Sequence, residues 1–191
     1  GTKHTIAISS AKGGVGKSTF AMNFALALKS TGSKVGILDA DIYGPSLPKM
    51  MSIKNKPESK DGKSLTPIEQ YGIQCMSIGF LVDEDTPMIW RGPMVTQALE
   101  QLLTDTQWKD VDYLIIDLPP GTGDVQLTLC QKIPVSGAVI VTTPRSKNRY
   151  KRLHAGDSFQ IRRCSHMEIL ANNTSQARSH ATIDNVYVAC E

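Results

Sequence analysis

One stretch near the amino terminus carries most of the residues that could do chemistry. Its sequence is AKGGVGKST, and the residues that we expect to contact a bound nucleotide are Lys12, Gly13, Gly14, Val15, Gly16, Lys17, Ser18 and Thr19. Glycines allow the backbone to curl so that successive N–H groups point at phosphate oxygens. Lys17 is placed to pair with the β- and γ-phosphates, and the Ser18 hydroxyl to occupy one position on Mg²⁺. The alternative is a glycine-rich turn between a strand and a helix that binds no ligand.

Carboxylates follow two apolar runs that we predict to be strands. Asp117 ends the run YLIID, and an apolar strand that ends in an aspartate beside a phosphate loop is the Walker B arrangement, in which the carboxylate holds Mg²⁺ through its water shell. Asp41 lies in the loop after strand 34–39, where it can orient the water that attacks the γ-phosphate. Asp39 ends that strand and its role stays open, because a strand-end aspartate is also a common cap or turn residue. In segment 118–124, two prolines restrict the backbone and two glycines let it move, which suits a loop that senses the γ-phosphate.

An α/β fold must position these residues. The first 144 residues alternate short apolar runs with helical stretches, which predicts a mostly parallel central sheet flanked by helices. The predicted strands are Thr5–Ser9, Lys34–Asp39, Gly72–Leu81, Tyr113–Leu118 and Ala138–Thr142, and the predicted helices are Ser18–Lys29, Met94–Leu103 and one near Val125–Gln131. Helical periodicity places Phe20, Phe24, Ala27 and Leu28 on one face of the first helix. Ala40–Lys63 is expected to be a long irregular loop.

Length and composition exclude several functional classes. The chain has 191 residues, of which 40% are hydrophobic and 20% charged, and this is typical of one globular domain. It contains no apolar run of about 18 residues, so we expect no membrane-spanning helix and no membrane partner. The net charge of +3 comes from residues 145–191, which hold eight basic and four acidic side chains; the main domain therefore gives no support for nucleic-acid binding. Four widely spaced cysteines favour a reducing compartment.

The phosphate loop departs from the strict GxxxxGK[ST] pattern, because Ala11 stands where the first glycine belongs. With its second lysine, Lys12, the run KGGVGKST resembles the deviant Walker A motif of the MinD, ParA and nitrogenase-iron-protein class of P-loop NTPases. In that class the extra lysine reaches the partner's phosphates across a nucleotide-sandwich homodimer. The resemblance implies this role for Lys12, with a solvated loop lysine as the alternative. Lys12, Lys17 and Asp41 are thus the expected catalytic residues.

Three longer segments narrow the resemblance. LDADIYGPSLPKMM, MSIGFLVDEDTPMIWRGPMVTQALEQLL and YLIIDLPPGTGDVQLTLCQKIPVSGAVIVTTP resemble the Mrp/ApbC family of iron–sulfur cluster carrier ATPases, and the likeness runs over residues 5–144. It implies a homodimer, in the bacterial cytoplasm or the mitochondrial matrix, that binds and slowly hydrolyses ATP with Mg²⁺. It also implies that the dimer holds a [4Fe–4S] cluster and delivers it to apo iron–sulfur proteins. A MinD- or ParA-like positioning ATPase, which binds a membrane or DNA, is the alternative.

The resemblance stops after Pro144. The family continues with an Asn-Met-Ser segment and a CxxC whose thiolates hold the cluster, whereas here a polar, basic sequence without CxxC follows. We therefore expect an ATPase domain over residues 1–144 and, over 145–191, a tail that looks like a truncation or a shift of reading frame. Only 161–163 and 185–189 suggest short strands in this tail. A chain that binds ATP but no cluster is a further alternative.

No cysteine of the chain is a convincing cluster ligand. Cys75 lies in a predicted strand and Cys130 in a predicted helix, where a buried structural cysteine is the common case. Cys164 lies near His154 and His166 in the sequence, but Cys-x-His is a poor ligand spacing for zinc.

Overall fold

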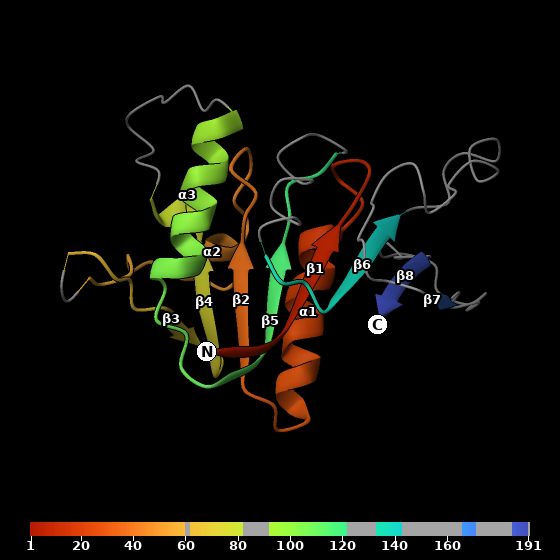
Figure 1. Ribbon diagram of the computed structural model, residues 1–191, viewed down its shortest axis with the longest axis horizontal. Helices are drawn as coiled ribbons and strands as arrows, with labels where there is room; N and C mark the ends of the chain where they lie inside the picture. Colours follow the sequence, from red (N-terminus) through yellow and green to blue (C-terminus); the bar gives the residue numbers. More distant parts are fainter. Residues whose placement is uncertain (60–61, 82–91, 122–132, 143–165, 171–184, 191) are drawn as a thin grey trace.

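The fold is a single sheet with helices on its two faces (Figure 1). The computed structural model describes residues 1–59, 62–81, 92–121, 133–142, 166–170 and 185–190. In this part of the chain the strands are β1 (Thr2–Ser9), β2 (Val35–Asp39), β3 (Ile68–Gln70), β4 (Ile73–Ser77), β5 (Val111–Asp117), β6 (Gly137–Thr142), β7 (His166–Leu170) and β8 (Asn185–Cys190), in the order β3-β4-β2-β5-β1-β6-β8-β7. The helices are α1 (Lys17–Ser30), α2 (Leu47–Met50), α3 (Gly92–Asp105) and the 3₁₀ turn η1 (Ile78–Phe80).

The central strands β4, β2, β5, β1 and β6 are parallel, which confirms the predicted sheet type. β3 pairs with β4, β8 with β6, and β7 with β8 in the antiparallel direction. Parallel strands end at one edge of a sheet, so the loops after β1, β2 and β5 begin side by side (Figure 1). The register makes this close, because Asp39 at the end of β2 lies opposite Asp117 at the end of β5.

The two faces of the sheet are covered by different helices. Successive residues of a strand point to opposite faces; Leu38 packs in the hydrophobic cluster that contains Leu99 of α3, and Ile37 packs in the cluster that contains Ala25 of α1. The buried strands therefore read as continuous apolar runs, as the sequence predicts for a parallel sheet.

Three of the four residues predicted to share one face of α1 pack against the buried core: Phe20, Phe24 and Leu28. Ala21 and Ala25 are fully buried, whereas Ala27 is exposed and Phe20 and Phe24 are only partly buried. The two phenylalanine rings stack on each other with their centroids 5.6 Å apart. Small side chains at the centre of the contact let the helix approach the sheet closely, and the larger ones pack at its sides.

Other elements differ from the predictions in detail. The predicted strand 72–81 ends at Ser77 and continues as η1, and the predicted loop 40–63 contains the short helix α2. β3 and β7 were not expected from the sequence, while the expected strand 185–189 is confirmed as β8. The predicted helix 125–131 and strand 161–163 lie outside the described residues, and the predicted domain boundary at 144 stays a prediction.

Candidate nucleotide-binding site

The phosphate loop joins β1 to α1, and its backbone takes the conformation that the glycine spacing predicts. Gly14 and Gly16 have φ angles of 75° and 87°, a left-handed conformation that side chains disfavour. Gly16 is also the residue that precedes α1, and its carbonyl accepts the N–H of Phe20 at 2.9 Å. The described first turn of α1 holds no acidic residue, so the positive end of the helix dipole stays available to an anion.

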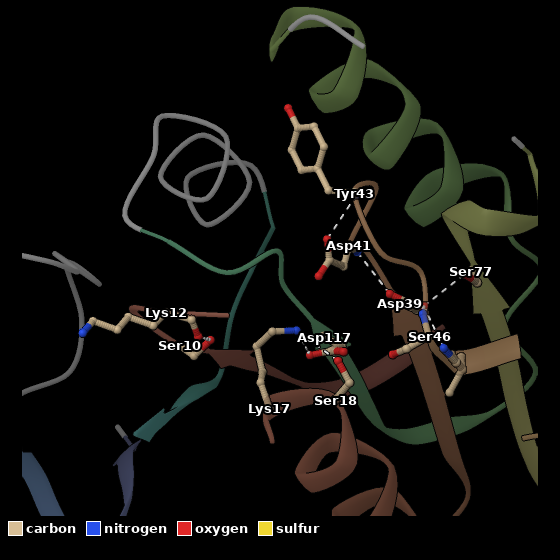
Figure 2. A network of polar contacts seen from close by, with 11 residues as sticks. Ser10, Lys12, Lys17, Ser18, Asp39, Asp41, Tyr43, Ser46, Ser77 and Asp117 are labelled. Atoms are coloured by element: carbon tan, nitrogen blue, oxygen red, sulfur yellow. Dashed lines mark hydrogen bonds and ion pairs between the residues drawn. The ribbon is translucent and has the colours of Figure 1, made fainter. Parts of the chain in front are cut away.

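Lys17 lies at the centre of the site (Figure 2). Its Nζ donates to Asp117 Oδ1 at 2.5 Å and to Ser18 Oγ at 3.3 Å. The side chains of Lys17 and Asp117 are only 6% and 4% exposed. A buried cation is tolerated only when an opposite charge compensates it, so Lys17 and Asp117 offset part of each other's cost of burial. The structure thus brings together three of the predicted site residues from α1 and β5.

The Asp117 carboxylate has the surroundings of a cation site. Burial raises its pKa above the ordinary value and the Asp41 charge adds to the rise, whereas the Lys17 charge and hydrogen bonds from Lys17 and Ser18 oppose it. The Ser18 hydroxyl and the Asp117 carboxylate are hard oxygen donors of the kind that Mg²⁺ prefers. These residues therefore fit the metal that the phosphate loop implies.

Asp39, which the sequence left open, is a structural carboxylate. It is completely buried and accepts the backbone N–H groups of Asp41 (3.1 Å), Ser46 (2.9 Å) and Leu47 (3.0 Å) and the Ser77 hydroxyl (3.2 Å). Burial raises the pKa of Asp39 to about 6, although the backbone donors limit the rise. Of the two roles that the sequence left open for Asp39, in the site or in a cap or turn, these contacts favour the turn.

Asp41 lies between Asp39 and Lys17 in the view of Figure 2. It is partly exposed, and its Oδ1 accepts the N–H of Tyr43 at 3.2 Å. Its charge raises the pKa of Asp117, so the two carboxylates are close enough to interact. The structure therefore places Asp41 beside the candidate phosphate site, on a loop and not on a strand.

Lys12 is exposed and extends away from Lys17 (Figure 2). The backbone carbonyl of Lys12 accepts the Ser10 hydroxyl at 2.9 Å, and the Ser10 carbonyl accepts the N–H of Gly121 at 2.9 Å. Pro120 also lies under the loop, since a Cβ at Gly13 would be 3.9 Å from its ring. The start of the segment after β5 therefore contacts the phosphate loop directly, while residues 122–124 of the predicted sensor lie outside the described residues.

Cysteine ligands are not assembled in the described part of the chain. Burial raises the pKa of the Cys75 thiol to about 12, so Cys75 is a structural cysteine as predicted. The described residues contain no group of three or more His, Cys, Asp or Glu side chains that could hold a metal ion. Cys130, Cys164 and His154 lie outside those residues.

Two residues of the site escaped the sequence analysis. Ser10 and Ser77 each follow an apolar run, but serine at a strand end is too common to be informative. The available signal was register: once β2 and β4 are paired, Ser77 falls opposite Asp39.

Comparisons with known proteins agree with this geometry. The family described as ParA, NUBPL iron-transfer P-loop NTPase, matches residues 1–182. The chain is 60% identical over 146 residues to an iron–sulfur cluster carrier protein of Escherichia coli K12, a stretch that is 76% of this chain and 40% of the relative. It is 54% identical over 147 residues to the iron–sulfur cluster transfer protein NUBPL of Mus musculus, covering 46% of that protein. The chain thus spans less than half the length of these curated relatives.

Solved structures show the same fold. A nucleotide-binding protein of Archaeoglobus fulgidus in complex with ADP is 40% identical, with a TM-score of 0.67 over 78% of this chain and 57% of that one. The MinD protein of an Aquifex aeolicus MinC–MinD complex, at 22% identity and a TM-score of 0.51 over 74% of this chain and 57% of that one, shares the fold alone. No helix in the described part of this chain is long and apolar enough to cross a membrane. By the match over residues 1–182, the chain belongs to the ParA family of P-loop NTPases, in the NUBPL iron-transfer group.

Proposed function

We propose that this chain is the ATP-binding part of an iron–sulfur cluster carrier. In this proposal it binds and slowly hydrolyses MgATP as a homodimer, and passes a [4Fe–4S] cluster to apo iron–sulfur proteins. The cluster of Lys17, Ser18 and Asp117 at the end of the phosphate loop is the observation that carries the nucleotide site. Relatives named as cluster carrier and transfer proteins support the cargo, and their bacterial and eukaryotic sources favour the bacterial cytoplasm or the mitochondrial matrix. The partners are proteins, not a membrane or nucleic acid.

ATP binding exchanges the partners of Lys17. The backbone N–H groups of residues 13–16 and the amino end of α1 attract the phosphates. Lys17 then leaves Asp117, to which its Nζ donates at 2.5 Å, and pairs with the β- and γ-phosphate oxygens. This frees the Asp117 carboxylate and the Ser18 hydroxyl, which would hold Mg²⁺ as a source of positive charge for the phosphates.

Hydrolysis needs two further groups. Asp41 lies beside the cluster of Lys17, Ser18 and Asp117 and orients the attacking water. Lys12 extends away from its own site, which suits a cation that stabilises charge on the partner's phosphates. The hydrogen bond from Gly121 to Ser10 gives the segment after β5 a direct path by which nucleotide state can reach it.

The decisive experiment replaces the central lysine. Lys17→Ala should weaken ATP binding by at least about 100-fold, since it removes the buried cation that pairs with the phosphates. Lys29→Ala is the matched control, because Lys29 lies at the far end of the same helix; it should bind ATP as the wild type does. Titration with a fluorescent ATP analogue measures both variants. Wild-type affinity in Lys17→Ala would refute the nucleotide site.

A chain that binds ATP but carries no cluster is the second candidate, and the absence of CxxC from the sequence favours it. Sequencing the coding DNA across codons 140–150 separates the two. A frame that encodes the Asn-Met-Ser segment and CxxC after Pro144 restores the carrier for the natural protein. An unchanged frame, with no iron or sulfide retained after anaerobic reconstitution, limits this chain to ATP binding.

A further inference from the structure

The side chain of Asp39 accepts hydrogen bonds from both ends of the loop that carries Asp41. Asp39 Oδ1 accepts the N–H of Asp41, where the loop begins, and Oδ2 accepts the N–H groups of Ser46 and Leu47, where it ends and α2 starts. These distances lie between 2.9 and 3.1 Å. Hydrogen bonds to an ionised acceptor are among the stronger ones in proteins. A single buried carboxylate therefore closes the loop 41–47.

Asp39 is itself held from the neighbouring strand. Ser77, at the end of β4, lies opposite Asp39 in the register and donates its hydroxyl to Oδ2 at 3.2 Å. The same hydroxyl accepts the N–H of Gly79 in η1 at 3.0 Å. Both side chains are completely buried. The Ser77 hydroxyl thus both donates and accepts a hydrogen bond, and it fixes the Asp39 carboxylate relative to β4 and η1.

Packing holds the loop in the same position. A Cβ at Gly79 would lie 2.8 Å from Cβ of Pro45, so the loop rests directly on the backbone of η1. Only glycine allows this approach, since real Cβ atoms do not come so near. The contact and the hydrogen bonds from Ser46 and Leu47 act on the second half of the loop, and the hydrogen bond from Asp41 acts on its first half.

The oxygens of Asp39 are used by these donors and not by a ligand. Four donors occupy the carboxylate, from Asp41, Ser46, Leu47 and Ser77. Asp41, by contrast, accepts only the Tyr43 N–H among the contacts that the described residues give it, and its charge acts on Asp117. One aspartate of the pair is committed to structure, and the other faces the site.

We propose that Asp39 and Ser77 form a clamp that positions Asp41 for the hydrolytic step, so that Asp39 is a positioning residue and not a ligand of Mg²⁺. This inference rests on the proposed function, because it assumes that Asp41 orients the attacking water. A clamp acts on the geometry of the water and not on the phosphates, which are bound by the loop after β1. Its loss should therefore lower kcat and leave nucleotide and metal affinity in place.

The first test is a kinetic split. Asp39→Asn turns an amide N–H₂ toward backbone donors, and kcat should fall at least about tenfold, with KM for ATP and half-saturating Mg²⁺ within about twofold of wild type. Adding Asp41→Asn to Asp39→Asn should cost no more than Asp41→Asn alone, because both changes remove the same oriented water. A tenfold rise in half-saturating Mg²⁺, or fully multiplicative losses in the double variant, would overturn the clamp.

The second test does not depend on activity. Amide exchange at Ser46 and Leu47 should accelerate at least about tenfold in Asp39→Asn and less in Ser77→Ala, because the donors lose a charged or fixed acceptor. Thr106→Val is the matched control, since it removes a buried hydroxyl that bonds to Leu102 in α3, far from the clamp; exchange at Ser46 and Leu47 and kcat should both stay as in wild type. If Asp39→Asn does not fold, Ser77→Ala carries both tests.

The two proposals fail in different ways. A wild-type chain that does not hydrolyse ATP contradicts the proposed function, and exchange then decides the clamp: faster exchange at Ser46 in Ser77→Ala supports it, and unchanged exchange overturns it. A wild-type chain that hydrolyses ATP, combined with an unchanged kcat in Asp39→Asn, overturns the clamp and leaves the proposed function standing.

Discussion

Two buried aspartates lie side by side at the ends of β2 and β5, and their negative charges are compensated in opposite ways. Asp39 and Asp117 face each other in the sheet register, and both are almost inaccessible, at 0% and 3% exposure. Asp117 is compensated by the charge of Lys17, a long side chain that can turn to another partner. Asp39 is compensated by donors that are mostly backbone N–H groups, which cannot move without moving the loop.

This difference separates a reacting carboxylate from a structural one. A buried ion pair with a flexible member can be opened by a ligand that offers a better anion, such as a phosphate. A carboxylate held by several fixed donors offers no such exchange, because every donor would be left unsatisfied. Position at a strand end is therefore not enough to assign chemistry to an aspartate. Whether the groups that compensate its charge can move determines whether it can react.

The largest effect should come from removing the charge of Asp117. Asp117→Asn leaves Lys17 buried without a counter-charge, which should cost about 3 kcal/mol of folding free energy in the ATP-free protein and abolish Mg²⁺-dependent hydrolysis. Urea unfolding and ATP turnover measure the two losses. The double variant Lys17→Met with Asp117→Asn should recover most of the stability but no activity, because the unpaired charge is gone. An equal stability loss in the double variant would show that Lys17 does not depend on Asp117.

The sequence predicted one side of this comparison better than the other. The glycine spacing and the apolar run before Asp117 were enough to place the phosphate loop, α1 and β5, because a phosphate loop and a fully buried strand leave signals in a short stretch of sequence. The role of Asp39 depends on Ser77, which lies 38 residues away and meets it only through strand pairing. The prediction for α1 was incomplete for a related reason: the sheet packs most closely on Ala21 and Ala25, which are selected by shape and not by hydrophobicity.

The next largest effect concerns the lysine that compensates neither aspartate. Lys12 is exposed and directed away from the Lys17–Asp117 pair (Figure 2). Lys12→Ala should therefore leave the Kd for ATP within about twofold of wild type and the free energy of unfolding close to the wild-type value. If the lysine serves the partner's site, the same variant should lower the rate of ATP hydrolysis about 100-fold. Mixing Lys12→Ala with an equal amount of Asp41→Asn provides the control, because mixed dimers then contain one complete site and regain activity. Absence of any recovery in the mixture would argue against a lysine that acts across the dimer.

The smallest effect is a difference in pH dependence between the two strand ends. Burial raises the pKa of Asp39 from 3.8 to about 6, so between these values the folded state binds more protons than the unfolded state, and the free energy of unfolding falls as the pH rises. From pH 5 to pH 7, the wild type should lose about 1 kcal/mol relative to Asp39→Asn, which cannot titrate there. Burial also raises the pKa of Asp117, but that group titrates in both proteins and cancels. Urea midpoints at the two pH values measure the difference. Parallel curves would mean that the four donors, and not burial, set the charge state of Asp39, and the contrast between the two aspartates would then lie only in the mobility of their partners.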